Sequence, residues 1–320
     1  MKSSEIRPDH LFQKYLQLSR DDGAVMDKTH FVQVNCPACD SIAKTGKFKK
    51  NGFQYNICNE CHSLFCSPRP TDEQLSAFYQ NSESSKYWAS VFFPAVAEVR
   101  REKLFKKKAA KIAELLHMKN LHPASICDVG AGYGIFLEEL RPHFIDSNLA
   151  AVEPDPILAA KCREKGFETI EATAEQTQAF HGRFDLVISS EVIEHVYSPL
   201  EFVQSLCSLV KPGGSCLMTG LGYEGFDILT LQENSQSVSA PHHINFMSIQ
   251  GFESLFKRAG FKHVEVTTPG VLDVDIVLKS DACPEYLKVL QSRGDEALQA
   301  LQDLLSKYKM SSHIWVWAQK

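Results

Sequence analysis

The chain has 320 residues, of which 44% are hydrophobic and 23% are charged, so its composition is that of a globular protein and argues against intrinsic disorder. Thirty-four lysines and arginines against 39 aspartates and glutamates give a net charge of −5, which argues against a protein held to nucleic acid by a large basic surface. The sequence shows neither the apolar core of a signal peptide nor a membrane-spanning run, so we expect a cytoplasmic protein with reduced cysteines.

The segment 31–70 is rich in cysteine. Two Cys-x-x-Cys pairs with eighteen residues between them match the spacing of a structural zinc site, in which four thiolates close a tetrahedron. The turn residues Asn51-Gly52 between them predict a hairpin. The alternative is four buried or redox-active thiols. The predicted zinc ligands are Cys36, Cys39, Cys58 and Cys61.

Helical patterns lie on both sides of this segment. Residues 1–30 are polar with one short apolar spacing that predicts a small helix. Residues 71–120 form a helical linker that begins at Thr71, where Gln74 completes a capping box. Its last helix carries a basic cluster that either meets an anionic ligand or forms a solvated face. The cluster comprises Arg100, Arg101, Lys103, Lys106, Lys107, Lys108 and Lys111.

From residue 121 to residue 320, short apolar strands alternate with helical segments. This alternation is typical of an α/β fold, in which a mostly parallel sheet is covered by helices on both faces. The predicted strands are 125–129, 149–153, 184–189, 215–219, 263–267 and 313–317.

A glycine loop follows the first of these strands. Glycines occupy positions 130, 132 and 134 behind Asp128, whereas a dinucleotide-binding loop would need its third glycine where Ile135 stands. Alternating glycines let the backbone pass close to a ligand at the carboxyl edge of a sheet, because they lack Cβ atoms. We therefore expect a ligand at Gly130, Gly132 and Gly134.

This loop resembles the cofactor loop of class I S-adenosylmethionine-dependent methyltransferases, which have a Rossmann-like fold. Glu153 ends the second strand, where that family places an acidic residue that binds ribose hydroxyls. The resemblance implies that Asp128 and the glycines hold the methionine end of S-adenosylmethionine. Further cofactor contacts are expected from Ala174, Glu175 and Ser190, the first two of them beside the adenine. The zinc ribbon before such a domain resembles a group similar to sugar C-methyltransferases.

A cluster of acid–base residues follows the fourth strand. A helix that begins near Ser190 would put Glu191, Glu194 and His195 on one face, and His243 lies in a later segment at the same sheet edge. In the sugar C-methyltransferases a similarly placed histidine is the proposed base, which maps onto His243. The same pattern also resembles metal-dependent RNA 2′-O-methyltransferases and quinone O-methyltransferases, where these residues hold a divalent ion. A purely structural role for these residues is also open.

Together these patterns and resemblances predict a methyltransferase that uses S-adenosylmethionine and a structural Zn²⁺ and acts on a small polar acceptor. The resemblance to sugar C-methyltransferases implies a nucleotide-linked or polysaccharide-associated sugar as that acceptor. Four lysines in the cysteine-rich segment leave open an RNA methyltransferase that grips nucleic acid with its zinc ribbon; these are Lys44, Lys47, Lys49 and Lys50. The patterns are also compatible with a metal-assisted O-methyltransferase and with a catalytically silent scaffold. No membrane partner is expected, and the sequence does not predict an oligomeric state.

Overall fold

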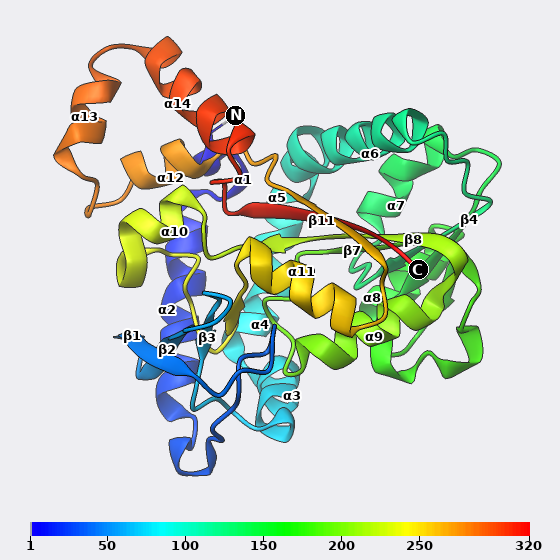
Figure 1. Cartoon of the computed structure of the whole chain (residues 1–320), viewed down its shortest axis with the longest axis horizontal. Coiled ribbons are helices and arrows are strands. Elements are labelled where there is room, and N and C mark those ends of the chain that lie inside the picture. The colour runs from blue at the N-terminus through cyan, green and yellow to red at the C-terminus, as the bar shows by residue number, and fades with distance from the viewer. Residues whose placement is uncertain (1) are drawn as a thin grey trace.

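The computed structural model describes residues 2–320, and its largest element is a seven-stranded sheet (Figure 1). The strands of this sheet are β4 (Ser125–Val129), β5 (Asn148–Val152), β6 (Glu168–Ile170), β7 (Phe184–Ser190), β8 (Val210–Leu221), β10 (His263–Thr267) and β11 (His313–Gln319). Their spatial order is β10-β11-β8-β7-β4-β5-β6. Strand β11 runs antiparallel to both of its neighbours, β10 and β8, and the other neighbouring pairs are parallel. The mostly parallel sheet and its six predicted strands are confirmed, whereas the three-residue β6 is too short to show a pattern in the sequence.

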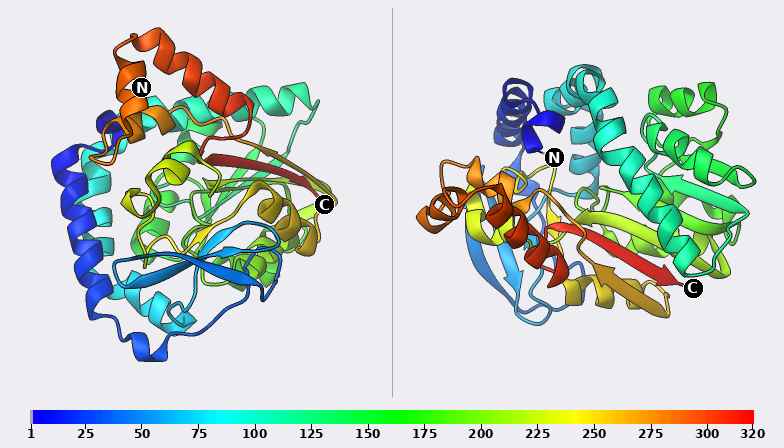
Figure 2. Two further views of the ribbon diagram at one scale, coloured as in Figure 1. Left: turned by 60° about the vertical axis from the view of Figure 1, so that its left-hand side comes forward. Right: turned by 90° about the horizontal axis from the view of Figure 1, so that it is seen from above.

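Helices cover both faces of this sheet, as Figures 1 and 2 show. On one face, Ile112 and Leu137 share an apolar core with Leu186 of β7; on the other, Val203 and Phe256 pack with Val187. The first face is covered by α6 (Lys106–Met118), α7 (Ile135–Leu140) and α8 (Pro156–Glu164), and the second by α9 (Pro199–Leu209) and α11 (Ile249–Arg258). Burial of the sheet on both faces agrees with its continuous apolar strands.

The cysteine-rich segment belongs to a second, four-stranded antiparallel sheet of order β1-β2-β3-β9. Its strands are β1 (Lys44–Lys50), β2 (Phe53–Cys58), β3 (Leu64–Cys66) and β9 (Asn245–Phe246). Asn51 and Gly52 form the predicted hairpin turn, with φ of 51° and 80°. Strand β9 comes from the chain between β8 and α11, so the cysteine-rich segment shares a sheet with the C-terminal half. The domain boundaries at 30, 70 and 120 stay predictions.

The N-terminal helices are longer than the sequence pattern indicates. Residues 1–30 contain the seventeen-residue α2 rather than a small helix, because its apolar side, including Tyr15, packs on Trp88 and Phe92 of the linker. The capping box of Thr71 and Gln74 is confirmed. These helices are α1 (Ser3–Ile6), α2 (Asp9–Val25), α3 (Asp72–Asn81), α4 (Glu83–Tyr87) and α5 (Phe93–Arg100), with π-helical turns at Trp88–Phe92 and Arg101–Phe105.

The remaining helices are α10 (Phe226–Leu231) and, between β10 and β11, α12 (Asp273–Leu278), α13 (Glu285–Gln291) and α14 (Asp295–Lys307). Short 3-10 turns lie at Lys28–His30, Arg141–His143, Ala174–Gln176, Gln178–Phe180 and Gln232–Asn234. The chain start docks on this group, since the Ser3 backbone N–H donates to Asp275 at 2.7 Å. Within residues 2–320, none of the helices has the length and apolarity that a membrane crossing requires.

Candidate functional site

The glycine loop between β4 and α7 has the conformation that its sequence requires. Gly130, Gly132 and Gly134 adopt φ of 79°, 55° and 68°, a left-handed region that other residues rarely occupy. A Cβ atom at Gly130 would lie 2.7 Å from Val192, whereas a Cβ atom at Gly132 would meet no protein atom within 4 Å. Gly130 is therefore needed for packing, while the space beside Gly132 is open to a ligand.

The carboxylate of Glu153 anchors this loop to the end of β5. The Gly132 N–H donates to Glu153 Oε2 at 2.7 Å, and the Asp155 N–H donates to Oε1 at 3.0 Å. Glu153 is buried, and burial raises its pKa. A carboxylate tied to the loop backbone is placed to accept further hydrogen bonds from a ligand beside Gly132.

The other predicted cofactor residues lie at the same carboxyl edge of the sheet, where α/β folds bind their ligands. Asp128 is 2% exposed, its Oδ1 has no hydrogen-bond partner within residues 2–320, and burial raises its pKa to about 7. The buried hydroxyl of Ser190 is also unpartnered there. Ala174 and Glu175 lie in the turn that follows β6, one buried and one exposed. Unpartnered polar atoms beside open backbone fit a ligand that is rich in hydrogen-bonding groups.

The predicted helix at Ser190 is wrong. Strand β7 continues to Ser190, and the Glu191 N–H extends the sheet by donating to the Thr219 carbonyl at 2.9 Å. Glu191 then turns the chain with φ of 57°, which no α-helix accommodates. The next helix, α9, begins only at Pro199, where Ser198 caps it.

Because of this turn, Glu191 is separated from the other predicted acid–base residues. Its carboxylate accepts a hydrogen bond from Thr219 at 2.7 Å and pairs with Lys108 at 3.6 Å and His313 at 3.4 Å. Burial opposes ionisation of Glu191, yet the neighbouring His313 and Lys108 lower its pKa to about 2. Burial lowers the pKa of His313 itself, so Lys108 is the cation that accounts for an ionised Glu191 in this partly buried group.

The turn brings Glu194, His195 and His243 together instead. One potential ligand atom from each lies within 4.8 Å of the others, and the two imidazole rings are 4.6 Å apart. Backbone contacts join the two segments, since the Ile244 N–H donates to the Glu194 carbonyl at 3.0 Å. Burial raises the pKa of Glu194 and lowers the pKa of both histidines, that of His243 to about 4. Burial thus disfavours the charged form of all three side chains.

Hydrogen bonds assign the same tautomer to both histidines. His243 Nδ1 lies 2.6 Å from the Ser237 carbonyl, which only accepts, so Nδ1 carries the proton. Tyr79 donates its one hydroxyl proton to the His242 carbonyl, so it accepts from His195 Nδ1 at 3.0 Å. Both Nε2 atoms therefore keep a free lone pair for a proton or a metal ion.

Sequence reasoning missed the residues that support this cluster. Tyr79 stands out in the sequence only as part of a helical stripe, and Tyr55, whose hydroxyl donates to the His243 carbonyl at 2.8 Å, only as part of a strand. His313 gives no signal beyond its predicted strand. Lys108 is visible in the basic cluster, but nothing in the pattern separates it from the exposed lysines beside it.

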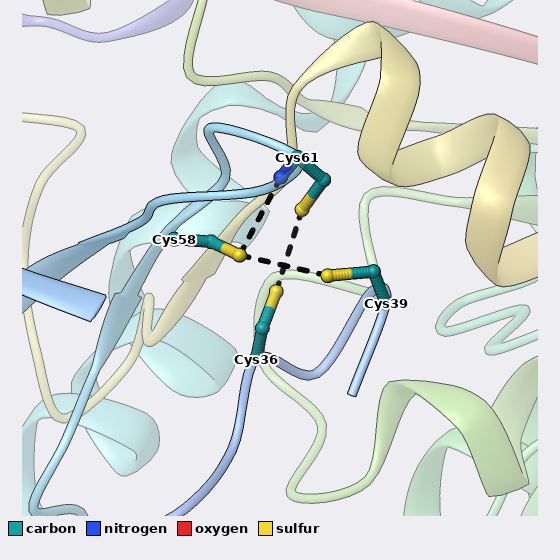
Figure 3. Close-up of side chains that lie close together, drawn as sticks. All are labelled: Cys36, Cys39, Cys58 and Cys61. Carbon is teal, nitrogen blue, oxygen red and sulfur yellow. Dashed lines mark hydrogen bonds between the residues drawn. The ribbon is translucent and has the colours of Figure 1, made fainter. Parts of the chain in front are cut away.

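The four predicted zinc ligands come together from two turns of the same shape (Figure 3). Cys36 Sγ lies 3.5 Å from Cys61 Sγ, and Cys39 Sγ lies 3.5 Å from Cys58 Sγ. With Zn–S bonds of about 2.3 Å, a tetrahedral site has S···S distances of about 3.8 Å, so these thiols fit the ion after a small expansion. The residue after each pair adopts positive φ, 67° at Asp40 and 60° at His62.

This cysteine cluster is docked on α11, with contacts to the residues at both of its ends. The Ser248 hydroxyl donates to the Cys61 carbonyl, and Arg258 donates to the Ala38 carbonyl at 2.7 Å. A Cβ atom at Gly251 would lie 2.2 Å from the Ser63 hydroxyl. The close fit means that the position of the cluster and that of the β9–α11 segment depend on each other.

The profile of a family described as "Methyltransferase domain" matches residues 100–266, which is more than half of the chain. The chain belongs to this methyltransferase family. A ubiquinone biosynthesis O-methyltransferase of Methylobacterium nodulans is 35% identical over 104 residues, covering 29% of this chain and 39% of that protein. The ubiquinone biosynthesis O-methyltransferase of Escherichia coli O7:K1 is 32% identical over 105 residues, covering 31% of this chain and 44% of that protein. The matched region is thus under half the length of these relatives.

Solved structures confirm the Rossmann-like class I methyltransferase fold. The plantazolicin methyltransferase BamL, solved with a triazolic desmethylPZN analogue and S-adenosylhomocysteine (SAH), aligns with a TM-score of 0.51 and 14% identity over 77% of this chain and 94% of that one. Human N-acetylserotonin methyltransferase, solved with S-adenosylmethionine, aligns with a TM-score of 0.50 and 14% identity over 78% of this chain and 60% of that one. At this identity the likeness establishes the fold of the methyltransferase domain and not its acceptor.

Proposed function

We propose that this methyltransferase moves a methyl group from S-adenosylmethionine to a small polar acceptor at the edge of the sheet where Glu194, His195 and His243 meet. The observation that carries the proposal is the loop held open at Gly132 and tied to Glu153 at 2.7 Å. The unpartnered Asp128 carboxyl supplies an acceptor for the amino group of the cofactor's methionine.

His243 is the proposed base. S-adenosylmethionine, when bound, supplies the electrophilic methyl group, so the protein has to orient the acceptor and remove its proton. The free Nε2 of His243 accepts that proton, and the Nδ1–H bond to the Ser237 carbonyl stabilises the imidazolium that forms. His195 and Glu194 orient the acceptor through hydrogen bonds.

The acceptor we propose is a sugar, nucleotide-linked or attached to a polysaccharide. Several buried polar atoms around the site lack partners within residues 2–320, and an acceptor with many hydroxyl groups would satisfy them. They belong to Glu194, Asp227 and Asn245. The relatives named for ubiquinone biosynthesis favour a phenolic acceptor instead. A methylation screen with labelled cofactor, run on nucleotide sugars and on catechols, decides between the two classes.

A metal-assisted O-methyl transfer is the second candidate. The 4.8 Å cluster of Glu194, His195 and His243 favours it, because metal-bound histidines usually donate their other N–H to an oxygen, as both do here. Glu191, held by Lys108 and His313, would not complete the ligand set. EDTA-treated enzyme is to be assayed with and without Mg²⁺, Mn²⁺ or Zn²⁺, and unchanged turnover would exclude this candidate.

RNA binding through the cysteine-rich segment is less well supported. Two of its four lysines form hydrogen bonds within the protein, since Lys44 donates to the Val34 carbonyl at 2.7 Å and Lys50 to the Ser235 carbonyl at 2.5 Å.

For the cysteine-rich segment we propose a structural Zn²⁺ on the four cysteines. Metal analysis of the purified protein should find one equivalent of zinc.

Calorimetry with SAH tests the proposal as a whole, because a catalytically silent scaffold would not need to bind it. We expect one site per chain. His243→Gln should keep SAH affinity within about threefold while methyl transfer falls about 100-fold or more, the size of a lost general base. His263→Gln, at an exposed position on β10, is the matched control and should change neither quantity.

A further inference from the structure

Two arginines near the proposed active site have no neutralising partner. Arg7 follows α1 and Arg100 ends α5, and neither takes part in an ion pair within residues 2–320. The Nε atom of Arg7 and the Nε and Nη1 atoms of Arg100 are buried and have no hydrogen-bond partner there. Burying an unpaired charge is costly, so these groups call for an anion.

Two other arginines of the chain have ion-pair or hydrogen-bond partners. Arg101, next to Arg100, pairs with Glu138 at 2.7 Å and with Glu139 at 2.9 Å. The buried Arg69 donates to the carbonyls of Cys66 and Tyr197, both at 3.0 Å. The Nη2 atom of Arg69 is also unpartnered within residues 2–320. Arg7 and Arg100 differ from Arg69 and Arg101 in having neither an ion pair nor a side-chain hydrogen bond there.

Aromatic rings hold both guanidinium groups in place. Arg7 lies over Phe12 at 5.4 Å, and Arg100 lies over Trp88 at 5.7 Å and Phe93 at 5.6 Å. Such rings attract a cation without occupying its N–H donors. The donors are thus preorganised and free to bind a planar or tetrahedral anion.

The two arginines are linked to the proposed active site. Phe93 stacks on Tyr133 with ring centres 4.9 Å apart and planes 1° from parallel, and Tyr133 lies between Gly132 and Gly134 of the cofactor loop. Arg7 also acts on the proposed base, since burial and the charge of Arg7 both lower the pKa of His243.

Two acidic residues act electrostatically on Arg7, but neither neutralises it. Glu191 is already paired with Lys108 at 3.6 Å. Asp227 is not within 4.0 Å of Arg7, and burial raises its pKa to about 7, so it is partly uncharged at neutral pH. An excess of positive charge therefore remains beside the site.

We propose that Arg7 and Arg100 bind an anionic group of the acceptor, a carboxylate or a phosphate. This inference rests on the proposed function and narrows its acceptor to an acidic or phosphorylated molecule. Arg7 lies outside the region that matches the family profile, so the site combines the N-terminal segment of this chain with its methyltransferase domain.

The test uses calorimetry on the full chain saturated with SAH, with inorganic phosphate and malonate as probes of the two anion types. We expect saturable binding of at least one probe to the wild type. Arg7→Gln and Arg100→Gln should weaken that binding at least about tenfold while SAH affinity changes less than threefold. Arg7→Lys and Arg100→Lys keep the positive charge but lose the planar set of guanidinium N–H donors. Their anion affinities should lie between those of the wild type and the glutamine variants. Arg20→Gln, at an exposed site on α2, is the control and should match the wild type.

Three outcomes would overturn the inference. The first is a wild type that binds SAH but neither anion. The second is anion binding that the arginine variants leave unchanged although circular dichroism shows them folded. The third is a loss of SAH affinity in those variants with the anions competing against SAH, because the arginines would then hold the carboxylate of the cofactor. A wild type that does not bind SAH at all would instead refute the proposed function itself.

Discussion

The hydroxyl of Tyr55, on strand β2 of the cysteine-rich sheet, donates a hydrogen bond to the backbone carbonyl of His243 at 2.8 Å and accepts one from the Ala240 N–H at 2.9 Å. Tyr55 is fully buried, and its phenol pKa is raised by that burial. The N-terminal sheet thus supports the segment that carries the proposed base.

Tyr55→Phe should therefore affect both stability and methyl transfer. It leaves a buried carbonyl and a buried N–H without partners, which costs about 1–3 kcal/mol of unfolding free energy. Urea denaturation measures this loss, and turnover should fall while zinc content stays at the wild-type level. Tyr308→Phe, at a residue that is 63% exposed, should match the wild type. Wild-type stability and turnover in Tyr55→Phe would show that the contact is dispensable.

Zinc removal should act on the active site through the same contacts. Cys58→Ser opens the four-thiol cluster, and because the cluster packs on α11 and β9 pairs with β3, we expect Tm to fall by about 10 °C or more. Methyl transfer should be lost before SAH binding, since the glycine loop lies on β4 and not on the small sheet. Cys283→Ser, a buried thiol between α12 and α13, is the control. If Cys58→Ser loses SAH binding as much as methyl transfer, the predicted order of loss is wrong.

A pair of glycine variants separates ligand crowding from backbone strain. Gly132 and Gly213 have φ of 55° and 78°, and a Cβ atom at either would meet no protein atom within 4 Å. Gly132→Val should weaken SAH binding at least about 100-fold, because its side chain fills the space assigned to the ligand. Gly213→Val, in the turn before the central part of β8, carries similar strain and should keep SAH affinity. If calorimetry finds the two variants alike, the ligand is not at Gly132.

Asp128 makes stability depend on pH. Its pKa is raised by burial from 3.8 to about 7, so the folded state binds the proton more tightly than the unfolded chain does. That contribution is complete below about pH 4 and is lost as pH rises to about 7. Relative to Asp128→Asn, the wild type without cofactor should thus lose at most about 4 kcal/mol across this range. Urea titrations at pH 4.5, 6 and 7.5 measure the difference, and a pH-independent difference would contradict the assignment.

Much of the fold and part of the site follow from short-range sequence patterns. Local spacing is enough to place the glycine loop, Glu153 and the paired cysteines in the fold: an alternation of glycines, an acidic residue at a strand end, two thiols per tight turn. The ligands assigned to these residues stay predictions. The parallel sheet is predictable for the same reason, since buried parallel strands are continuous apolar runs.

Only the tertiary structure decided which side chains meet. His195 and His243 are brought to 4.6 Å by a turn that replaces the predicted helix, and that turn exists because Glu191 stays hydrogen-bonded to the neighbouring strand β8. Packing of the N-terminal helices, which no local pattern encodes, brings Arg7 close enough to act on the pKa of His243. Spacing along a chain determines turns and strand ends, whereas the partners of a buried charge are determined by contacts between residues far apart in sequence.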